Sequence, residues 1–381
     1  WPTYSEEEIK KVSELLLSGN VNYRNGKHSK TFEKNFSKYI GAKYAIGLFN
    51  GSVALEIALR VLDIKRGDEI IVTPRSFIIS SSVPMLLGAK PVFADIDPNT
   101  LGLTLDSVKR VVTKKTKAII AVHLGGVPCD IINISKFAKK NKISLIEDCS
   151  QAHGATIKNI KLGSIGEIST FSFCKDKIIS TGGEGGMILT NEKKLYKKIY
   201  EYKDHGKDIN QQNKFLLNYN YIHNSLGSNY RITEFQSCLG IVQLKKIKKN
   251  LNKRNFIAKS IYKIASKFPN LIRVPKINKN NYNAYYVCYL FLKQDGLKKN
   301  INISKVILLL RQKGIESSVG ACPELYKEKV FSNYVRKNFY LKNARMLSNQ
   351  TICLNINHNF SKSFLQTYLE ILEDIFYKIK K

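Results

Sequence analysis

Short hydrophobic runs alternate with amphipathic stretches along the first half of the chain. The runs, rich in Ile, Val and Phe, predict strands, and the stretches between them predict helices. Strands that alternate with helices pair in parallel and are buried, so the pattern predicts an α/β fold with a mostly parallel central sheet. The predicted strands are 44–49, 69–73, 91–96, 118–122, 143–146 and 170–173, and the predicted helices are 5–19, 31–40, 53–62, 77–87, 131–140 and 191–205.

The pattern changes near residue 250. A polar loop is predicted over 206–228, followed by a helix, continuous or broken once, over 231–266. We expect two domains: a large one over 1–250, whose N-terminal segment could pack on the second, and a small α+β domain over 251–381. The strands predicted beyond the long helix are 282–292, 315–319 and 351–356, and the helices are 304–313 and 363–379.

The chain carries 62 Lys and Arg against 30 Asp and Glu, a formal net charge of +32. Such a charge is typical of nucleic-acid-binding proteins. Here, however, the lysines are spread along the whole chain, and the densest cluster, 245–249, lies on a predicted helix where charges normally face water. The composition therefore argues against nucleic acid as the main partner. A positive surface would still attract an anionic substrate such as a nucleotide diphosphate.

The seven cysteines are scattered and form no Cys-x-x-Cys pair. An odd number without paired spacing argues against a disulfide framework and a zinc site, so we expect no metal. A reducing cytoplasm is then the simplest location. No apolar run approaches the roughly 18 residues of a membrane span, and we expect neither such a span nor a signal peptide.

The most distinctive stretch is 170–186, which reads TFSFCKDKIISTGGEGG. It places Lys177 between an apolar strand and a glycine-rich turn whose backbone can approach a ligand closely. A lysine that is partly removed from water loses its proton more easily, and a neutral amine is a nucleophile toward an aldehyde. The alternative is a surface lysine beside a flexible turn, and residues upstream decide between the two.

Two upstream positions complement this lysine. Asn50-Gly51-Ser52 lies where a helix begins after a strand, and free N–H groups there bind phosphate, unless the segment is an ordinary helix cap. Asp148 ends a buried strand, where an unpaired carboxylate is costly, so it needs a cationic ring nitrogen, a helix cap or a salt bridge. Phosphate, ring nitrogen and aldehyde are the three polar groups of pyridoxal phosphate (PLP) that a protein can bind. The three candidate positions together therefore predict this cofactor.

Five segments in order resemble the DegT-type family of nucleotide-sugar aminotransferases. They are 67–74 (GDEIIVTP), 88–97 (GAKPVFADID), 147–154 (EDCSQAHG), the stretch around Lys177, and 229–234 (NYRITE). Each motif alone is weak, but five in this order are specific. The resemblance implies the fold of PLP-dependent aspartate aminotransferase (type I) and a homodimer whose active sites are shared between subunits.

The resemblance also implies roles for the residues around the cofactor ring. Lys177 would form a Schiff base with PLP and move protons during transamination. Asp148 would pair with the pyridinium nitrogen, Gln151 with the phenolic oxygen, and Phe77 would lie over the ring. Asp176 departs from the family pattern, because relatives often have Asn or a small residue directly before the lysine.

The same resemblance implies sites for the phosphate and for the amino donor. Gly51, Ser52 and Ser172 would bind the phosphate, joined by Asn229 from the other subunit. Arg231 would hold the carboxylate of the donor. Members of the family often have Thr where this chain has Ser52, which is a conservative change.

The implied activity is amino transfer from L-glutamate to a nucleotide-linked keto-sugar, such as a 4-keto-6-deoxyhexose, for surface glycans such as lipopolysaccharide. Pyridoxamine phosphate would carry the amino group between the two. Two alternatives stay open: a sugar dehydratase that uses either form of the cofactor, and a non-catalytic regulatory or binding protein on this fold. Dehydratases of the family carry His at the Schiff-base position, so Lys177 favours transamination. A pure binder would not need Lys177, Asp148 and Gln151 together.

Overall fold

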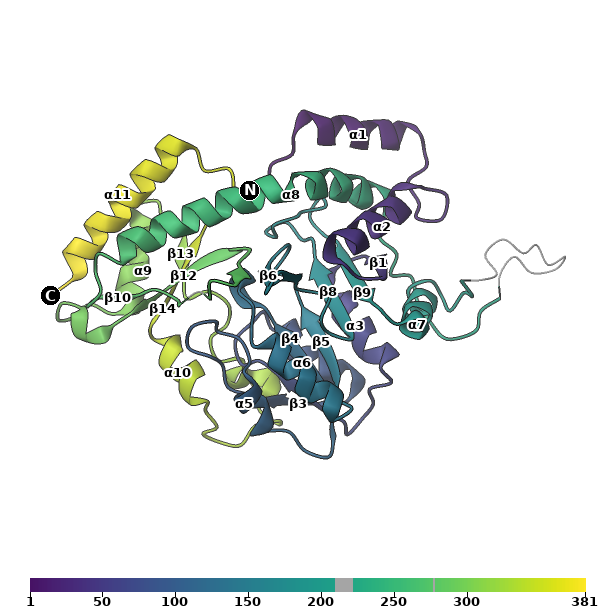
Figure 1. The fold of residues 1–381 in the computed structure, drawn as a ribbon, viewed down its shortest axis with the longest axis horizontal. Coiled ribbons are helices and arrows are strands. Elements are labelled where there is room, and N and C mark those ends of the chain that lie inside the picture. Colours follow the sequence, from purple (N-terminus) through teal and green to yellow (C-terminus); the bar gives the residue numbers. More distant parts are fainter. Residues whose placement is uncertain (210–221, 277) are drawn as a thin grey trace.

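The protein is built around a seven-stranded sheet (Figure 1). The computed structural model describes residues 1–209, 222–276 and 278–381. All neighbouring strands pair in parallel except one, β9, which is antiparallel to β1 and β8, so the predicted α/β fold with a mostly parallel sheet is confirmed. The order is β1 (Tyr44–Leu48), β9 (Gly186–Thr190), β8 (Ile168–Ser172), β5 (Ser144–Asp148), β4 (Thr116–Val122), β2 (Glu69–Val72) and β3 (Lys90–Phe93).

Alternate residues of each strand contact different cores. On β2, Ile70 and Val72 belong to one core, whereas Ile71 belongs to the core on the opposite face. Because successive side chains of a strand point to opposite faces, burial on both sides requires the continuous hydrophobic runs seen in the sequence. The first core includes residues of α3 (Gly51–Val61) and α7 (Lys193–Lys203), and the second those of α2 (His28–Ile40), α5 (Leu105–Lys109), α6 (Ile131–Lys140) and α8 (Glu234–Ala265).

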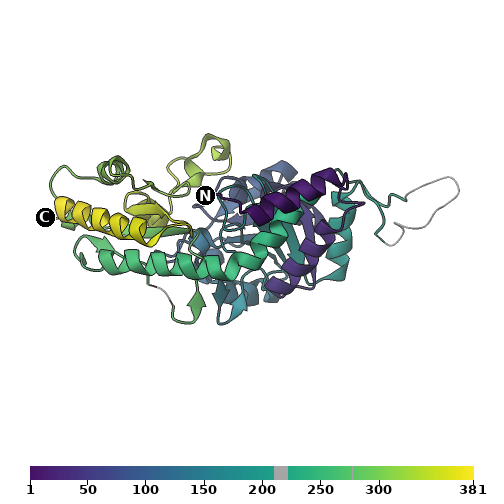
Figure 2. The same ribbon diagram turned by 90° about the horizontal axis from the view of Figure 1, so that it is seen from above.

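A second, antiparallel sheet lies in the C-terminal part, in the order β10 (Ile272–Arg273), β12 (Val287–Leu292), β14 (Thr351–Asn355) and β13 (Ser317–Ser318). Its core also contains α9 (Ile303–Gln312), α11 (Lys362–Ile379) and the second half of α8. Figure 2 shows α8 running from α2 to α11, so one helix contacts both parts. The domain boundary at residue 250 stays a prediction. The other α-helices of the described chain are α1 (Glu6–Leu17), α4 (Ile79–Ser82) and α10 (Lys342–Ser348). A small third sheet contains β11 (Asn281–Tyr282), β6 (Thr156–Ile157) and β7 (Ile160–Lys161).

Two predictions about elements are wrong in detail, strand β9 was missed, and the long helix takes one of its two expected forms. The helix expected over 77–87 is α4 followed by a 3-10 helix that contains Pro84, which has no N–H to continue α-helical bonding. The strand expected over 282–292 is divided into β11 and β12, because the N–H groups of Ala284 and Tyr286 bond to the loop after β4 instead. Strand β9 was not predicted, since its five residues directly follow the glycine-rich turn. Helix α8 is continuous over 32 residues and has no break.

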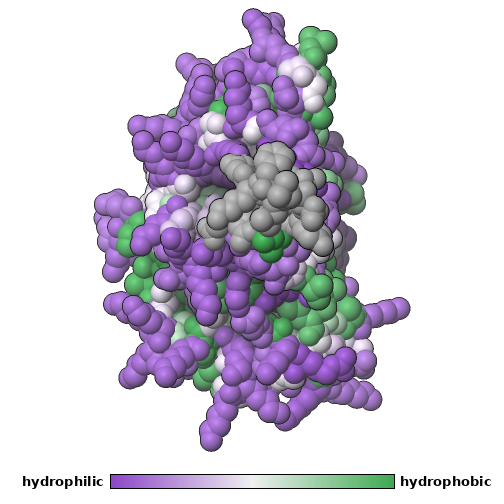
Figure 3. All heavy atoms as spheres, turned by 90° about the vertical axis from the view of Figure 1, so that its right-hand side faces the viewer, coloured by the Kyte–Doolittle hydropathy of each residue, from purple (hydrophilic) through white to green (hydrophobic). Residues whose placement is uncertain are grey.

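Hydrophilic residues dominate the face shown in Figure 3, and hydrophobic residues lie between them in small groups. Within the described part of the chain, no helix is both long and apolar enough to cross a membrane. All seven cysteines are free. Part of the polar loop expected over 206–228, namely 210–221, lies outside the described residues.

Candidate active site

A cavity of about 770 Å³ lies at the carboxyl ends of the parallel strands. Ligands of open α/β sheets bind at this edge, because the loops that follow the strands converge there. Segments after β1, β2, β5 and β8 all contribute to its wall, together with residues of the C-terminal part. Seven of the predicted site residues line it: Gly51, Ser52, Phe77, Asp148, Gln151, Ser172 and Lys177.

One end of the cavity is the N-terminus of α3. The Asn50 side chain caps the helix, because its Oδ1 accepts the N–H of Val53 at 2.9 Å. Gly51 lies so close to β8 that a Cβ there would come within 2.7 Å of the Cβ of Ser172. The glycine therefore lets the first turn of α3 and the Ser172 hydroxyl face the same space. Free N–H groups, a hydroxyl on each side and the helix dipole make this end suited to a phosphate.

The floor of the cavity holds Asp148 at the end of β5, and its side chain is nearly buried, with 3% of the residue exposed. Oδ2 accepts a hydrogen bond from the Ser80 hydroxyl at 2.7 Å, and Oδ1 accepts the Ser150 N–H at 3.1 Å. No cationic side chain among the described residues forms an ion pair with it. A buried carboxylate of this kind suits a cationic ring nitrogen in the cavity.

Ser80 was not predicted as a site residue. It also lies 3.1 Å from the Ser76 hydroxyl, and both serines line the cavity. The available signal was their spacing of four residues after β2, which places both hydroxyls on one face of a helical turn.

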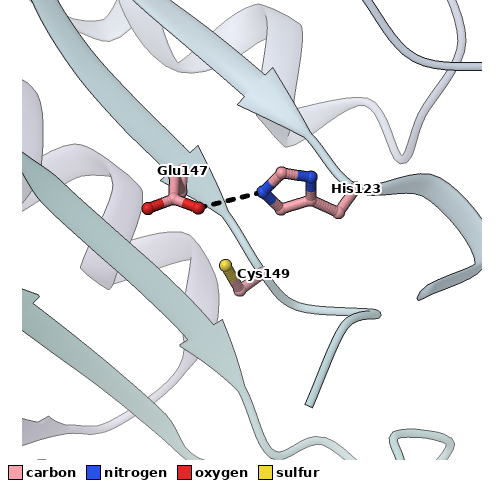
Figure 4. A group of neighbouring side chains, drawn as sticks. All are labelled: His123, Glu147 and Cys149. Carbon is pink, nitrogen blue, oxygen red and sulfur yellow. Dashed lines mark hydrogen bonds and ion pairs between the residues drawn. The ribbon is translucent and has the colours of Figure 1, made fainter. Parts of the chain in front are cut away.

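A second buried carboxylate, Glu147, lies directly before Asp148 but does not line the cavity, and its side chain faces His123 (Figure 4). It accepts the N–H groups of Gly163, Ile165 and Gly166 at 2.6–2.9 Å and lies 3.1 Å from His123 Nε2. Burial raises its pKa, but the bonds from His123 and the backbone outweigh burial and lower it.

Glu147, His123 and Cys149 form a group whose potential metal-ligating atoms all lie within 4.8 Å of one another. The Glu147 oxygens are already occupied by four donors, and His123 Nδ1 accepts the Cys129 N–H at 3.3 Å. A metal would have to displace these bonds. The group is therefore better explained as a support that fixes the end of β5, and with it Asp148.

Gln151 lies beside Asp148 on the loop after β5. Its Oε1 accepts the N–H of Gly125 at 2.7 Å, which fixes the orientation of the amide. The Nε2 hydrogens are thereby left to donate, and the residue lines the cavity. The free amide hydrogens suit an anionic acceptor, such as the phenolic oxygen of PLP that the resemblance predicts beside Gln151.

Lys177 enters the cavity from the turn after β8, and 14% of its side chain is exposed. Its Nζ lies 3.1 Å from Asp176 Oδ2, 3.4 Å from the Tyr286 hydroxyl and 4.8 Å from the centre of the Tyr286 ring. Tyr286 comes from the segment between β11 and β12, which the sequence patterns placed inside a strand and did not assign to the site.

Phe77 is 67% exposed at the cavity, where its ring is free to cover a ligand. Asn229 and Arg231 do not line the cavity of this chain among the described residues. The Arg231 guanidinium pairs instead with Asp204, and the backbones of Arg231 and Asn229 bridge to Leu48 and Asp204. These two positions therefore lie beside the end of β1, outside the cavity that holds Lys177.

Comparison with known proteins gives a consistent result. Residues 2–373 match the DegT/DnrJ/EryC1/StrS aminotransferase family. GDP-perosamine synthase of Escherichia coli O157:H7 is 32% identical over 368 residues, which cover 94% of this chain and 97% of that protein. The solved aminotransferase of Psychrobacter cryohalolentis is 38% identical with a TM-score of 0.97, over 100% of this chain and 98% of that one.

A solved Escherichia coli GDP-4-keto-6-deoxy-D-mannose-3-dehydratase, which holds hydrated PLP, is 26% identical with a TM-score of 0.85, over 98% of both chains. The family match extends over nearly the whole sequence, and the resemblance inferred from five short motifs is confirmed. The chain belongs to the DegT/DnrJ/EryC1/StrS aminotransferase family.

Proposed function

We propose that the protein is a PLP-dependent aminotransferase that transfers an amino group to a nucleotide-linked keto-sugar for glycan biosynthesis. The observation that carries the proposal is the single cavity in which Lys177, Asp148, Gln151 and the N-terminus of α3 come together. Family membership and relatives such as GDP-perosamine synthase support the same reaction class.

The residues of the cavity fit the cofactor at each of its polar groups. The first turn of α3, with Ser52 and Ser172, offers hydrogen-bond donors to the phosphate. Asp148 offers an unpaired carboxylate to the ring nitrogen, and Gln151 offers its amide hydrogens to the phenolic oxygen. Lys177 offers an amine to the aldehyde.

When bound, the cofactor supplies an electron sink for the carbon that loses or gains a proton. Asp148 would keep the ring nitrogen protonated, because a buried carboxylate favours a neighbouring cation. Lys177 would hold the cofactor through its amine and, when free, would take and return the proton at the substrate carbon as a general base and acid. Gln151, Ser52 and Ser172 would bind the polar groups of the cofactor and so fix its position.

L-glutamate is the proposed amino donor, with Arg231 as the group that binds its carboxylate. The net charge of +32 supports an anionic substrate such as a nucleotide-linked sugar. A panel of UDP-, dTDP- and GDP-linked keto-sugars with glutamate tests both parts, with products identified by mass spectrometry. Gain of one nitrogen by a sugar, with release of 2-oxoglutarate, is the expected result. If no keto-sugar of the panel gains nitrogen from glutamate, the proposal is contradicted.

Sugar dehydration is a second candidate, because the similar dehydratase of Escherichia coli has the same fold over nearly its whole length. Dehydration would give a deoxygenated sugar with no nitrogen gained, which the same mass spectra would reveal. Lys177 at the position where the resemblance places His in dehydratases favours amino transfer.

The proposal includes a homodimer with shared active sites. Asn229 and Arg231 lie outside the cavity of their own chain, as expected of residues that serve the cavity of a partner. Mixing the inactive variants Lys177→Ala and Asn229→Ala should restore activity in heterodimers, since one of the two sites then has both residues. A fully active monomer in solution would contradict the shared site.

We further propose a cytoplasmic location and a product used in surface glycans such as lipopolysaccharide. The seven free cysteines, five of them buried, support a reducing compartment. Cell fractionation followed by immunoblotting tests the location, and loss of an amino sugar from surface glycans after gene deletion tests the pathway.

A further inference from the structure

Asp176, next to the predicted cofactor lysine, is fixed on both of its oxygens. Oδ2 accepts a hydrogen bond from the Tyr286 hydroxyl and lies 3.1 Å from Lys177 Nζ. Oδ1 accepts the Cys174 thiol at 2.7 Å. The carboxylate is therefore held in one orientation although 47% of its side chain is exposed. An unconstrained surface aspartate would have no such set of donors.

Tyr286 is itself positioned by the backbone. Its N–H donates to the carbonyl of Gly125 at 3.0 Å, and its carbonyl accepts from Arg254 Nη1 at 3.2 Å. Arg254, only 1% exposed, also binds the carbonyl of Ile356 at 2.8 Å and thereby ties α8 to the end of β14. The hydroxyl that orients Asp176 therefore has a fixed position relative to the sheet.

The Lys177 amine faces several ionisable groups, of which Asp176 is the one carboxylate within ion-pair distance among the residues described. The His153 ring packs against Phe171 of β8. Burial, aided by the charge of Lys177, lowers the pKa of His153 to about 3, so it is neutral. The other ionisable side chains lining the cavity are Asp148, Cys174, Glu184, Tyr289, Cys322, Glu328 and Cys353.

We propose that Asp176 and Tyr286 form a docking site for the Lys177 ammonium, which holds this side chain in place in the cofactor-free protein. The inference rests on the proposed function, because it takes Lys177 as the cofactor-bearing residue. Asp176 and Tyr286 are positioning residues, since they act through Lys177.

The charge of Asp176 provides the electrostatic attraction for the Lys177 ammonium. Burial raises the pKa of this carboxyl, but Lys177, Cys174 and Tyr286 outweigh burial and lower it to about 2, so Asp176 is ionised at any working pH. A fixed anion beside an amine favours its protonated form. For attachment, the ammonium would first release one proton to solvent. The neutral amine would then add to the aldehyde carbon, and its two hydrogens would leave with the aldehyde oxygen as one water molecule. Only the unprotonated fraction of Lys177 reacts, so the docking site also slows attachment of the cofactor.

The rate of cofactor attachment as a function of pH tests this inference. The full chain is stripped of cofactor, PLP is added, and the adduct is trapped with borohydride and mapped by mass spectrometry. Asp176→Asn should lower the midpoint of the pH–rate curve by about one unit and raise the rate near pH 7 about tenfold. Asp176→Glu, which keeps the charge, should restore most of the wild-type midpoint.

Two further variants separate this role from a general effect of charge. Glu184 lines the same cavity, and its side chain makes no hydrogen bond or ion pair with the residues described, so Glu184→Gln is the matched control and should leave the midpoint unchanged. Tyr286→Phe keeps the ring and removes the hydroxyl. It should shift the midpoint in the wild type and have no further effect in Asp176→Asn, because the two residues act as one unit.

The outcomes distinguish the inference from the proposed function. An adduct on Lys177 with the same midpoint in wild type, Asp176→Asn and Glu184→Gln would overturn the docking site and leave the proposed function intact. An equal shift in Asp176→Asn and Glu184→Gln would also overturn it. An adduct that maps to another lysine, such as Lys175, would instead contradict the assignment on which the inference rests.

Discussion

The floor of the cavity and its lysine side are built in different ways. Asp148, on the floor, is 3% exposed, and Glu147 directly before it is fully buried with four hydrogen-bond donors. On the lysine side, the Asp176 side chain is 47% exposed and contacts Tyr286, a residue 110 positions away in the sequence. The floor is a product of neighbouring strand ends, whereas the lysine side needs contact between distant segments.

This difference indicates which carboxylates of the site can be substituted without loss of stability. A buried carboxylate with four donors has no solvent to replace a lost bond, so its removal should affect folding. An exposed carboxylate can be replaced by water, so its removal should affect the chemistry of Lys177 more than the stability of the fold. Four experiments test this contrast, in order of expected effect.

Lys177→Ala should have the largest effect. In the proposed function, removing the amine would eliminate both covalent attachment of the cofactor and the general base, so activity should fall by at least about 10³-fold. Spectra of the purified protein should lose the band of the lysine-bound cofactor, and borohydride should fix no cofactor. Lys175→Ala is the control, two residues away, and should retain the adduct. A persistent adduct in Lys177→Ala would show that the site is misassigned.

Glu147→Gln should lower the free energy of unfolding by about 3 kcal/mol. An amide has one acceptor oxygen, so it cannot accept from three backbone N–H groups and His123 together. Urea titration followed by circular dichroism measures the change. Glu167→Gln, at an exposed position just before β8, is the matched control and should stay within about 0.5 kcal/mol of wild type. Equal stability of the two variants would remove the contrast between floor and lysine side.

Asp148→Asn should lower kcat about 10- to 100-fold, because the ring nitrogen loses a charged partner. The amide oxygen can keep the bond from the Ser150 N–H, and the Ser80 hydroxyl can rotate to accept from the amide N–H. The unfolding free energy should therefore change far less than in Glu147→Gln. Steady-state kinetics and urea titration on one preparation give both values. A large loss of stability with unchanged kcat would show that Asp148 supports the fold and does not act in the reaction.

Asp176→Asn should have the smallest effect on stability, less than about 1 kcal/mol at pH 7, because its ion pair is half exposed. The folded pKa of about 2 lies below the ordinary value of 3.8, so the carboxylate stabilises the fold above about pH 4 and loses this contribution as pH falls through about 2. The difference between wild type and Asp176→Asn in urea titrations should therefore shrink on acidification. A difference that grows at low pH would contradict the depressed pKa.

Much of the fold was predictable because strand and helix patterns are local. Runs such as 118–122 and the helix over 131–140 match β4 and α6 within a few residues. Strand β9 and the interruption between β11 and β12 were missed for a common reason. Both depend on hydrogen bonds to distant segments, β9 to β1 and residues 284–286 to the loop at Gly125 and Gly126.

The candidate site shows the same division. Lys177, Asp148 and Gln151 were predicted because each lies at or after a recognisable strand in a family motif, and Gly51 because a helix begins there after a strand. All four line one cavity. Ser80 and Tyr286 were not predicted, since nothing in their local sequence shows that one reaches Asp148 and the other Asp176.

The sequence by itself determined most of the strands and helices, the family, and several of the side chains at the carboxyl ends of parallel strands, because hydrophobic periodicity and turn residues act over a few positions. Tertiary structure alone decided that Asp148 lines the cavity while Glu147 does not, and that Tyr286 reaches Asp176 and Lys177. The physical reason is the separation along the sequence between the residues that come into contact. A contact across 110 residues is set by how the second sheet and α8 pack on the first, and no local pattern encodes that packing.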